Sequence, residues 1–515
     1  MADRMINPTV YQIYVRSFRD TTGSGEGDLR GVLDGLGHIR DLGADAIWLS
    51  PFYASPHADG GYDIADHRSV DPRYGTLDDV AAVIEKAHGM GLAVIADLVF
   101  NHTSCEHPWF LAALGGDEDA ARRYVFHDPK PDGTVPNNWL SYFGPPAWEW
   151  AHQRRQYYLH QFLACQPSLN LRNEEVQEDH RETCRFWCGM GMDGFRLDAV
   201  TAFLFDESLA DNPPARPEVR AKINGPDFSP YVWQDHTYDL LPGDGYTYAC
   251  KIRDWAGDGK WLMGECNTGN NSIEIVKSFT GEGRLDALYT TDTVEDGDGP
   301  EIYARILTEM DGKWTMPIWF SCHDHERVAS SLGDGSAEAA KFYAAVQAMM
   351  PGPTLMFQGE ELGLPQPHLE KDEVTDPFDL LYWPDGPGRE GPRVPVPWTR
   401  EAPAFGFTGA APWLPMRWDP EISVEAQRTR PDSVLSFVRR ALRVRRDEGF
   451  AHARRCAPTV EGRVLRLEIE TDRGRYRAEL NFGADPVRFS EGEEVLRVGS
   501  ADGRLGRWGA SIVRA

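Results

Sequence analysis

The sequence predicts an α/β protein, a (β/α)₈ TIM barrel with a small domain inserted after strand 3 and a C-terminal antiparallel β domain. Short apolar runs recur along the chain, and each is followed by a segment with helical periodicity, which is typical of βα units around a parallel sheet. An open, doubly wound sheet is the alternative, but it rarely needs eight strands over so long a chain. The expected strands are Val10–Phe18, Ala46–Ser50, Leu92–Phe100, Gly194–Val200, Trp261–Glu265, Leu285–Tyr289, Pro317–Ser321 and Thr354–Phe357.

Two segments interrupt this alternation and set the expected domain boundaries. Residues 102–170 have no clear helical period and are too long for a simple loop. Residues 360–415 are rich in Pro and Gly, and from Cys456 onward apolar and polar residues alternate as in a strand. The expected helices include Leu77–Met90, Glu174–Met190, Ala337–Met350 and Pro431–Asp447. The predicted parts are a barrel over 1–101, an inserted domain B over 102–170, the rest of the barrel over 171–447 and the β domain over 448–515.

Composition excludes several classes of function. The formal net charge of −27 argues against nucleic-acid binding, because neutralising phosphates requires clustered Lys and Arg. The eight cysteines are too few and too scattered for a disulfide scaffold, so we interpret them as reduced thiols. The N-terminus does not resemble a secretory leader, and no apolar run is long enough to span a membrane. We therefore expect a cytoplasmic monomer or homodimer that binds neither nucleic acid nor membranes.

Charged side chains lie at the ends of four expected strands, where a barrel of this class builds its site. Each of them alone has a structural explanation, such as a helix cap or a polar rim residue. Their joint occurrence at matched strand ends favours a catalytic site. They are Asp97 and His102 after strand 3, Arg196 and Asp198 at strand 4, Glu265 at strand 5, and His323 and Asp324 at strand 7.

This set of groups suits the cleavage of glycosidic bonds. That reaction needs one protonated carboxyl group to protonate the leaving oxygen and one ionised carboxylate to attack the anomeric carbon. Arg196 precedes Asp198 by two positions on one strand, so both side chains point the same way, and we expect Arg196 to lower the pKa of Asp198. Glu265 follows an apolar run, and we expect burial to raise its pKa and keep it protonated.

Four segments carry a resemblance to the α-amylase superfamily, glycoside hydrolase family 13. They read DLVFNHTS, GFRLDAV, GECN and HDHER, in the order and spacing of that family. The stretches VYQIYVRSFRD, GGYDIADH, FQGEELGLP and GREGPRVPVPW resemble its bacterial α-glucosidase and oligo-1,6-glucosidase branch, and the similarity covers essentially the whole chain.

The resemblance implies a role for each matching residue. It makes Asp198 the nucleophile, Glu265 the general acid/base and Asp324 a third carboxylate that binds sugar hydroxyls. It makes Asp63 the residue that grips the terminal glucose and Tyr62 the aromatic beneath that ring. A clamp on a terminal sugar implies a pocket and therefore exo-acting cleavage. Further substrate contacts are implied for His102, Arg196, His323 and Arg393.

Two features bear on linkage and metal binding. In this branch a valine after the nucleophile accompanies preference for α-1,6 links, so Ala199 indicates α-1,4 substrates such as maltose, unless the position only packs the barrel. The family's metal loop keeps Asp20 and Asp28 but has Thr22 and Ser24 between them, which predicts a weak or lost calcium site and no required cofactor.

The leading hypothesis is thus a retaining α-glucosidase acting on a small oligosaccharide or glucoside. A transglucosylase or a sucrose or maltose isomerase with the same site is the alternative. A non-catalytic binding subunit on this fold is remote, because all three carboxylates are present. A metal-dependent hydrolase is equally remote, because we expect no grouped set of His and carboxylate ligands.

Overall fold

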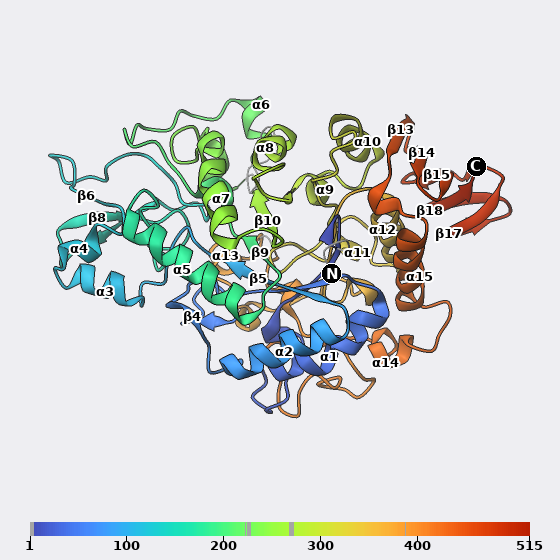
Figure 1. Cartoon of the computed structure of the whole chain (residues 1–515), viewed down its shortest axis with the longest axis horizontal. Coiled ribbons are helices and arrows are strands. Elements are labelled where there is room, and N and C mark those ends of the chain that lie inside the picture. The colour runs from blue at the N-terminus through green and yellow to red at the C-terminus, as the bar shows by residue number, and fades with distance from the viewer. Residues whose placement is uncertain (1–4, 222, 224–227, 267–271, 387) are drawn as a thin grey trace.

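The computed structural model describes residues 5–221, 223, 228–266, 272–386 and 388–515. Within these ranges seven parallel strands form a curled sheet in the order β11-β10-β9-β5-β2-β1-β12, which gives the predicted barrel (Figure 1). The predicted runs overreach the strands, since Val10–Phe18 for example divides into β1 and a 3₁₀ turn at Val15–Ser17. The strands are β1 (Thr9–Ile13), β2 (Ala46–Leu49), β5 (Ala93–Leu98), β9 (Gly194–Leu197), β10 (Trp261–Cys266), β11 (Ala287–Thr290) and β12 (Thr354–Phe357).

The predicted strand Pro317–Ser321 is wrong as a regular strand. This segment reaches β12 through one parallel bridge, from Ile318 to Thr354, and reaches β11 through a bond from the Leu288 amide to the Thr315 carbonyl. Pro317 has no amide hydrogen, so the segment lacks one of the donors that a continuous ladder needs. The barrel wall is therefore closed here by isolated hydrogen bonds.

Helices cover the outside of the sheet (Figure 1). The predicted helices at 77–90, 174–190 and 337–350 are confirmed, with two of them ending one residue earlier. Local sequence explains where they begin: Thr76 and Asp79 form a capping box, and Asn173 and Ser336 cap the other two. The main helices are α1 (Leu29–Leu42), α2 (Leu77–Gly89), α5 (Glu174–Met190), α7 (Pro242–Ala256), α8 (Ser272–Phe279), α10 (Pro300–Glu309), α12 (Ala337–Met349) and α15 (Val434–Asp447). Shorter ones are α6 (Pro217–Arg220), α9 (Asp292–Glu295), α11 (Val328–Ser331), α13 (Pro377–Leu381) and α14 (Val424–Gln427).

The segment after β5 leaves the barrel and forms structure of its own. It carries α3 (Pro108–Leu114), α4 (Glu118–Ala121) and a small antiparallel sheet of β6 (Phe126–His127), β8 (Gln156–Leu159) and β7 (Trp148–Ala151). Trp139 and Trp148 are buried there with Phe205 in a separate apolar cluster. Another two-stranded piece, β3 (Tyr53–Ala54) and β4 (Asp66–Val70), follows β2. The exact domain boundaries stay predictions.

The C-terminal part forms the expected antiparallel sheet beyond α15, at the right of Figure 1. Its strands are β13 (Arg455–Glu461), β14 (Val464–Thr471), β15 (Gly474–Asn481), β16 (Val487–Arg488), β17 (Glu493–Ala501) and β18 (Arg504–Arg514). Alternate side chains such as Leu465, Leu467 and Ile469 are buried, in the pattern that predicted the sheet.

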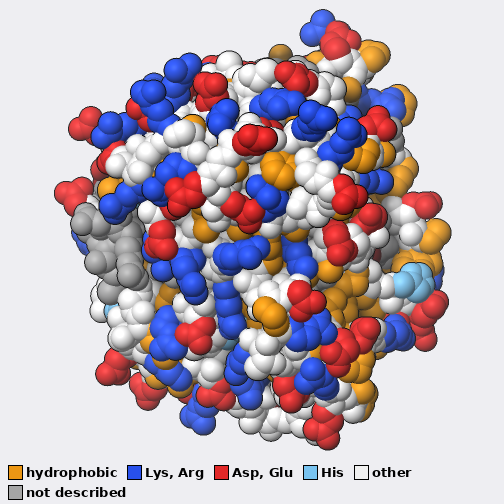
Figure 2. Space-filling model, turned by 90° about the vertical axis from the view of Figure 1, so that its right-hand side faces the viewer, with side chains coloured by type: hydrophobic (Ala, Val, Ile, Leu, Met, Phe, Trp, Pro, Cys, Tyr) orange, Lys and Arg blue, Asp and Glu red, His pale blue; other side chains and the backbone are white. Residues whose placement is uncertain are grey.

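Charge is unevenly distributed over the chain. Residues 431–515 contain 17 Arg against 13 Asp and Glu, so the excess of negative charge lies in the barrel part. Figure 2 shows basic and acidic side chains interspersed on one face, with a column of basic groups through its middle. Among the described residues no helix is both long and apolar enough to cross a membrane. All eight cysteines lie in the described ranges, and none of them forms a disulfide.

Candidate active site

One buried arginine organises the predicted catalytic residues. Arg196, on β9, is fully buried, and its Nη1 lies 2.6 Å from Asp198 Oδ1 and 2.9 Å from Asp97 Oδ1. Its Nη2 lies 2.6 Å from Glu265 Oε2 on the neighbouring strand β10. Arg196 also donates to the Tyr289 hydroxyl from β11, at 2.7 Å. Side chains from four adjacent strands or strand ends therefore meet on one guanidinium group: three of these strands were predicted to contribute, and the fourth contributes Tyr289, which was not predicted.

Burial, more than the neighbouring Arg196, sets the pKa of the predicted nucleophile Asp198. Burial raises the pKa of Asp198 well above its usual range, and the charges of Glu265 and Asp97 add to this, while Arg196 opposes it. The prediction that Arg196 would leave the pKa of Asp198 lowered is therefore wrong, because burial outweighs it. Arg196 also contacts both Asp198 and Glu265, so its charge does not act on Asp198 alone.

The residue after Asp198 has a strained backbone. Ala199 has a φ of 43°, in the left-handed region that residues with a side chain seldom adopt. In this conformation its amide donates a hydrogen bond to Glu265 Oε2 at 3.1 Å. The position is therefore more than barrel packing, because its backbone orients the predicted acid/base.

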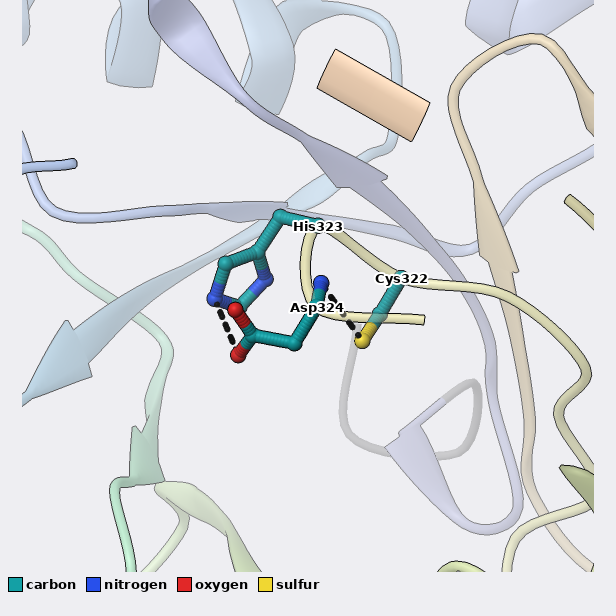
Figure 3. A group of neighbouring side chains, drawn as sticks. All are labelled: Cys322, His323 and Asp324. Atoms are coloured by element: carbon teal, nitrogen blue, oxygen red, sulfur yellow. Dashed lines mark hydrogen bonds and ion pairs between the residues drawn. The ribbon is translucent and has the colours of Figure 1, made fainter. Parts of the chain in front are cut away.

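Asp324 is held by three cationic or polar partners. Its Oδ1 accepts hydrogen bonds from Arg389 Nε at 2.9 Å and from Arg393 Nη2 at 3.0 Å, and its Oδ2 lies 2.9 Å from His323 Nε2 (Figure 3). Although burial alone would raise it, Arg389, His323 and Arg393 hold the pKa of Asp324 well below its usual range. Its charged form is therefore favoured, which suits a group that accepts hydrogen bonds.

The structure gives Asp63, the residue expected to grip the terminal glucose, a different set of contacts. Asp63 is fully buried, and its carboxylate accepts hydrogen bonds from Ser55 Oγ and from the Ala58 and Asp59 amides at 2.9–3.1 Å. It therefore supports its own loop, and the structure does not favour the direct sugar contact expected of it. Asp59, in contrast, is linked to Asp324, because its Oδ1 lies 3.2 Å from Arg389 Nη2, the group that also contacts Asp324 at 2.8 Å.

The aromatic floor lies where the sequence placed it. The Tyr62 ring stacks on His323 with centroids 4.8 Å apart, and its hydroxyl donates to Asp97 Oδ2 at 2.9 Å. His102 Nε2 lies 3.1 Å from the Tyr62 carbonyl oxygen, and burial lowers the pKa of His102 to about 3. A neutral His102 and a fixed Tyr62 give a flat, rigid wall beside the carboxylates.

Comparison with known proteins decides the family. The model of the alpha amylase catalytic domain matches residues 12–452. This chain belongs to the alpha-amylase family. It is 41% identical over 452 residues to a probable alpha-glucosidase of Rhizobium meliloti (strain 1021), covering 85% of this chain and 81% of the relative. It is 32% identical over 484 residues to an oligo-1,6-glucosidase of Heyndrickxia coagulans, covering 85% and 84%.

Solved structures of alpha-amylase-family enzymes match over nearly the whole length. An alpha-glucosyl transfer enzyme, XgtA, superposes with a TM-score of 0.92 at 34% identity, covering 99% of both chains. The trehalulose synthase MutB superposes with a TM-score of 0.85 at 27% identity, again covering 99% of both. The fold, the glycoside hydrolase class and the resemblance found in the sequence are thereby confirmed.

This member of the alpha-amylase family does group possible metal ligands, contrary to our expectation. Ligand atoms of Cys322, His323 and Asp324 all lie within 4.8 Å of one another (Figure 3). The set does not suit a cation, because Arg389 and Arg393 already neutralise Asp324. Burial also raises the pKa of the Cys322 thiol well above its usual range, which leaves it a poor ligand.

The family's calcium loop is filled by protein donors. Asp20 Oδ1 accepts from the Thr22 and Gly23 amides at 2.8 and 2.9 Å, and its Oδ2 accepts from the Gly25 amide at 2.8 Å and from Thr408 Oγ1 at 2.5 Å. Burial alone would raise the pKa of Asp20, but its hydrogen bonds lower it, and the bond from Thr408 contributes most. Asp28 instead caps α1 through the Gly31 amide at 2.7 Å. The donors present do not fit a calcium ion.

Sequence reasoning missed several groups of the site. Asp59, Arg389 and Gln166 were not predicted, although Gln166 Nε2 donates to Asp59 Oδ2 at 3.0 Å and lies 3.1 Å from His102 Nε2. Tyr142 was also missed. Burial raises the pKa of its hydroxyl, and the charges of Glu265 and Asp324 add to this, so Tyr142 lies near both carboxyl groups. Arg389 lies four residues before the predicted contact Arg393, close enough for the stretch GREGPR to have indicated it. Tyr142 comes from the inserted segment, whose loops give no periodic signal.

Proposed function

We propose that this enzyme is a retaining, exo-acting α-glucosidase that releases glucose from the non-reducing end of short α-glucosides. The observation that carries the proposal is the contact of Arg196 with both Asp198 and Glu265, beside an ionised Asp324. Asp59, Arg389 and Tyr62 close one end of this group and fit a terminal sugar ring. The relatives named as glucosidases support the same class.

The proposed mechanism has two displacements. Asp198 attacks the anomeric carbon while Glu265 gives its proton to the glycosidic oxygen, so the bond to the aglycone breaks and the alcohol leaves. Water then attacks the glucosyl ester on Asp198 while Glu265 takes a proton from it, and glucose leaves with its configuration retained. Asp324 binds hydroxyl groups of the ring, and Arg196 stabilises the carboxylate that returns when the ester breaks.

Replacement of the two carboxyls tests this assignment. Asp198→Asn and Glu265→Gln should remain folded by circular dichroism and lose at least about a thousandfold in kcat on an aryl α-glucoside. An aryl leaving group needs little protonation, so azide should restore turnover of the Glu265→Gln variant but not of Asp198→Asn. Normal turnover in either variant would contradict the proposal.

A transfer reaction is the second candidate, favoured by the likeness to the alpha-glucosyl transfer enzyme. In it a sugar hydroxyl replaces water in the second displacement. Free glucose and new oligosaccharides measured together from concentrated maltose separate the two reactions. Rates on maltose and isomaltose test the proposed preference for α-1,4 links.

We also propose that the enzyme requires no metal cofactor, because protein donors occupy Asp20 and Asp28. The cytoplasmic location and the monomeric or homodimeric state stay predictions. Size-exclusion chromatography with light scattering tests the oligomeric state.

A further inference from the structure

Two cysteines lie on neighbouring segments close to His102 and Gln166. After β5, residues 101–105 run antiparallel to residues 165–169. The Leu169 amide donates to the Asn101 carbonyl at 2.9 Å, Thr103 to Pro167 at 3.3 Å and Cys105 to Cys165 at 2.7 Å. From bond to bond the first segment advances by two residues and the second steps back by two, so the backbones of Cys105 and Cys165 lie opposite each other where the two segments run into turns.

This register matches the geometry of a disulfide. Hydrogen-bonded partners in antiparallel strands have Cα atoms about 5.5 Å apart, which is close to the commonest separation of disulfide-bonded cysteines. Both side chains are partly exposed, so a small oxidant has access to them. Cys184 and Cys188 provide an internal comparison, because they lie four residues apart on the single helix α5 and face no opposite strand.

The ladder forms the wall behind the sugar clamp. His102 bridges to Ser168 within it, and Gln166, next to Cys165, contacts both His102 and Asp59. Burial raises the pKa of both thiols, that of Cys165 to about 12; the charge of Asp63 adds to this at Cys165, and the charges of Glu106 and then Asp63 add to it at Cys105. A bond between the two sulfur atoms would therefore act directly on the groups around the terminal sugar.

We propose that Cys105 and Cys165 form a reversible disulfide that fixes the wall of the sugar pocket. With oxidised glutathione as the oxidant, the Cys105 thiolate attacks one sulfur of that disulfide and a glutathione thiolate leaves. The Cys165 thiolate then attacks the Cys105 sulfur and releases the second glutathione. Two protein thiols are oxidised, one glutathione disulfide is reduced, and the two thiol protons pass to the leaving thiolates. The scarcity of thiolate on Cys165 makes this second step the slow one.

Peptide mapping tests the bond itself. The intact protein is held with oxidised glutathione at mildly alkaline pH, its remaining thiols are alkylated, and it is digested with trypsin. Peptides 87–122 and 156–172 should appear joined, lighter by two hydrogens than their sum, and should separate on reduction. Cys105→Ser and Cys165→Ser should each abolish the joined species, whereas the control Cys188→Ser should keep it. Glutathione adducts without the joined species, or no change at all, would overturn the proposal.

Two measurements test whether the bond fixes the wall. The oxidised form should melt several degrees higher than the reduced form, because the bond closes a long loop of the unfolded chain. Its KM for an aryl α-glucoside should change by at least about twofold, since shifts of about 1 Å in positioning groups alter rates strongly. Both changes should reverse with dithiothreitol and be absent in Cys105→Ser.

The KM readout rests on the proposed function, whereas the peptide map and the melting temperature do not. A joined peptide with the same melting temperature and KM as the reduced protein would refute a role in the pocket wall. If the enzyme shows no glucosidase activity but the bond forms and raises the melting temperature, only the proposed function fails.

Discussion

Arg196 lies between the two carboxyl groups assigned to bond cleavage, with Nη1 2.6 Å from Asp198 and Nη2 2.6 Å from Glu265. A third carboxylate, Asp97, accepts from the same guanidinium, and the Arg196 side chain is fully buried. One positive charge thus serves three acidic groups, so loss of that charge should affect both folding and catalysis.

Arg196→Met should destabilise the protein by about 3–5 kcal/mol, because it leaves buried carboxyl groups without their counter-charge. Urea unfolding and kcat of the folded fraction measure the two effects, and kcat should fall by orders of magnitude. Arg445→Met is the matched control, since Arg445 is equally buried but bonds to backbone carbonyls of residues such as Gln347. It should lower stability while the folded fraction keeps its kcat. Unchanged stability in Arg196→Met would contradict the prediction.

Ala199→Val should change linkage preference and also cost stability. The left-handed φ of 43° disfavours a β-branched side chain, at about 1–2 kcal/mol. The same side chain stands beside the nucleophile, so the ratio of isomaltose to maltose hydrolysis should rise. Ala199→Gly, which tolerates this backbone, should keep the wild-type ratio. Equal ratios in all three proteins would reduce the position to a packing role.

Glu360 should make stability fall with rising pH. It begins the 3₁₀ turn Glu360–Leu362 after β12, and burial raises its pKa from 4.5 to about 8. Its contribution to folding is complete below pH 4.5 and is lost as pH rises to about 8, because the unfolded chain releases the proton first. The Gln side chain of Glu360→Gln cannot ionise, so the free energy of unfolding of this variant should fall less between pH 5 and 8 than that of the wild type. The difference between the two proteins should be at most about 5 kcal/mol.

Urea unfolding of wild type and Glu360→Gln at several pH values measures this difference. Glu338→Gln, which removes an exposed carboxyl group from α12, should retain the wild-type profile. Parallel profiles for wild type and Glu360→Gln would show that Glu360 is ionised in the folded protein.

Chelation should leave the enzyme unchanged. The carboxylate of Asp20 accepts bonds from three backbone amides and the Thr408 hydroxyl, so a cation would have to displace donors already in place. Dialysis against EDTA and addition of calcium should each leave the melting temperature and kcat/KM within error. Thr408→Ala should lower stability by about 1 kcal/mol, because it removes one of those hydrogen bonds. A melting temperature that rises with calcium would overturn this prediction.

Strand ends were the part of the site that sequence predicts well. Asp198, Glu265 and Asp324 follow buried runs, and parallel strands bring such positions to one rim whatever the loops do. Asp59 and Arg389 escaped prediction because their contact joins residues 330 positions apart, through loops without periodicity. The pKa of Asp198 was predicted in the wrong direction, since burial depth depends on packing from several strands. The prediction of the seventh strand was wrong because an apolar run indicates burial but not hydrogen bonding. Pro317 has no amide hydrogen and cannot donate to a neighbouring strand.

We expect residues 315–321, the seventh segment of the barrel wall, to be the first part of the barrel to unfold locally. Residues 315–318 reach β11 and β12 through isolated hydrogen bonds, and Asp324 follows a few residues later. Amide hydrogens of 318–321 should therefore exchange with solvent faster than those of β5 or β9, as mass spectrometry can measure. On heating, we expect the geometry around Asp324 to be lost while most of the barrel persists, so activity should disappear a few degrees before the far-ultraviolet circular dichroism changes. In that case this short segment, and not the stability of the whole fold, would govern the heat tolerance of the enzyme.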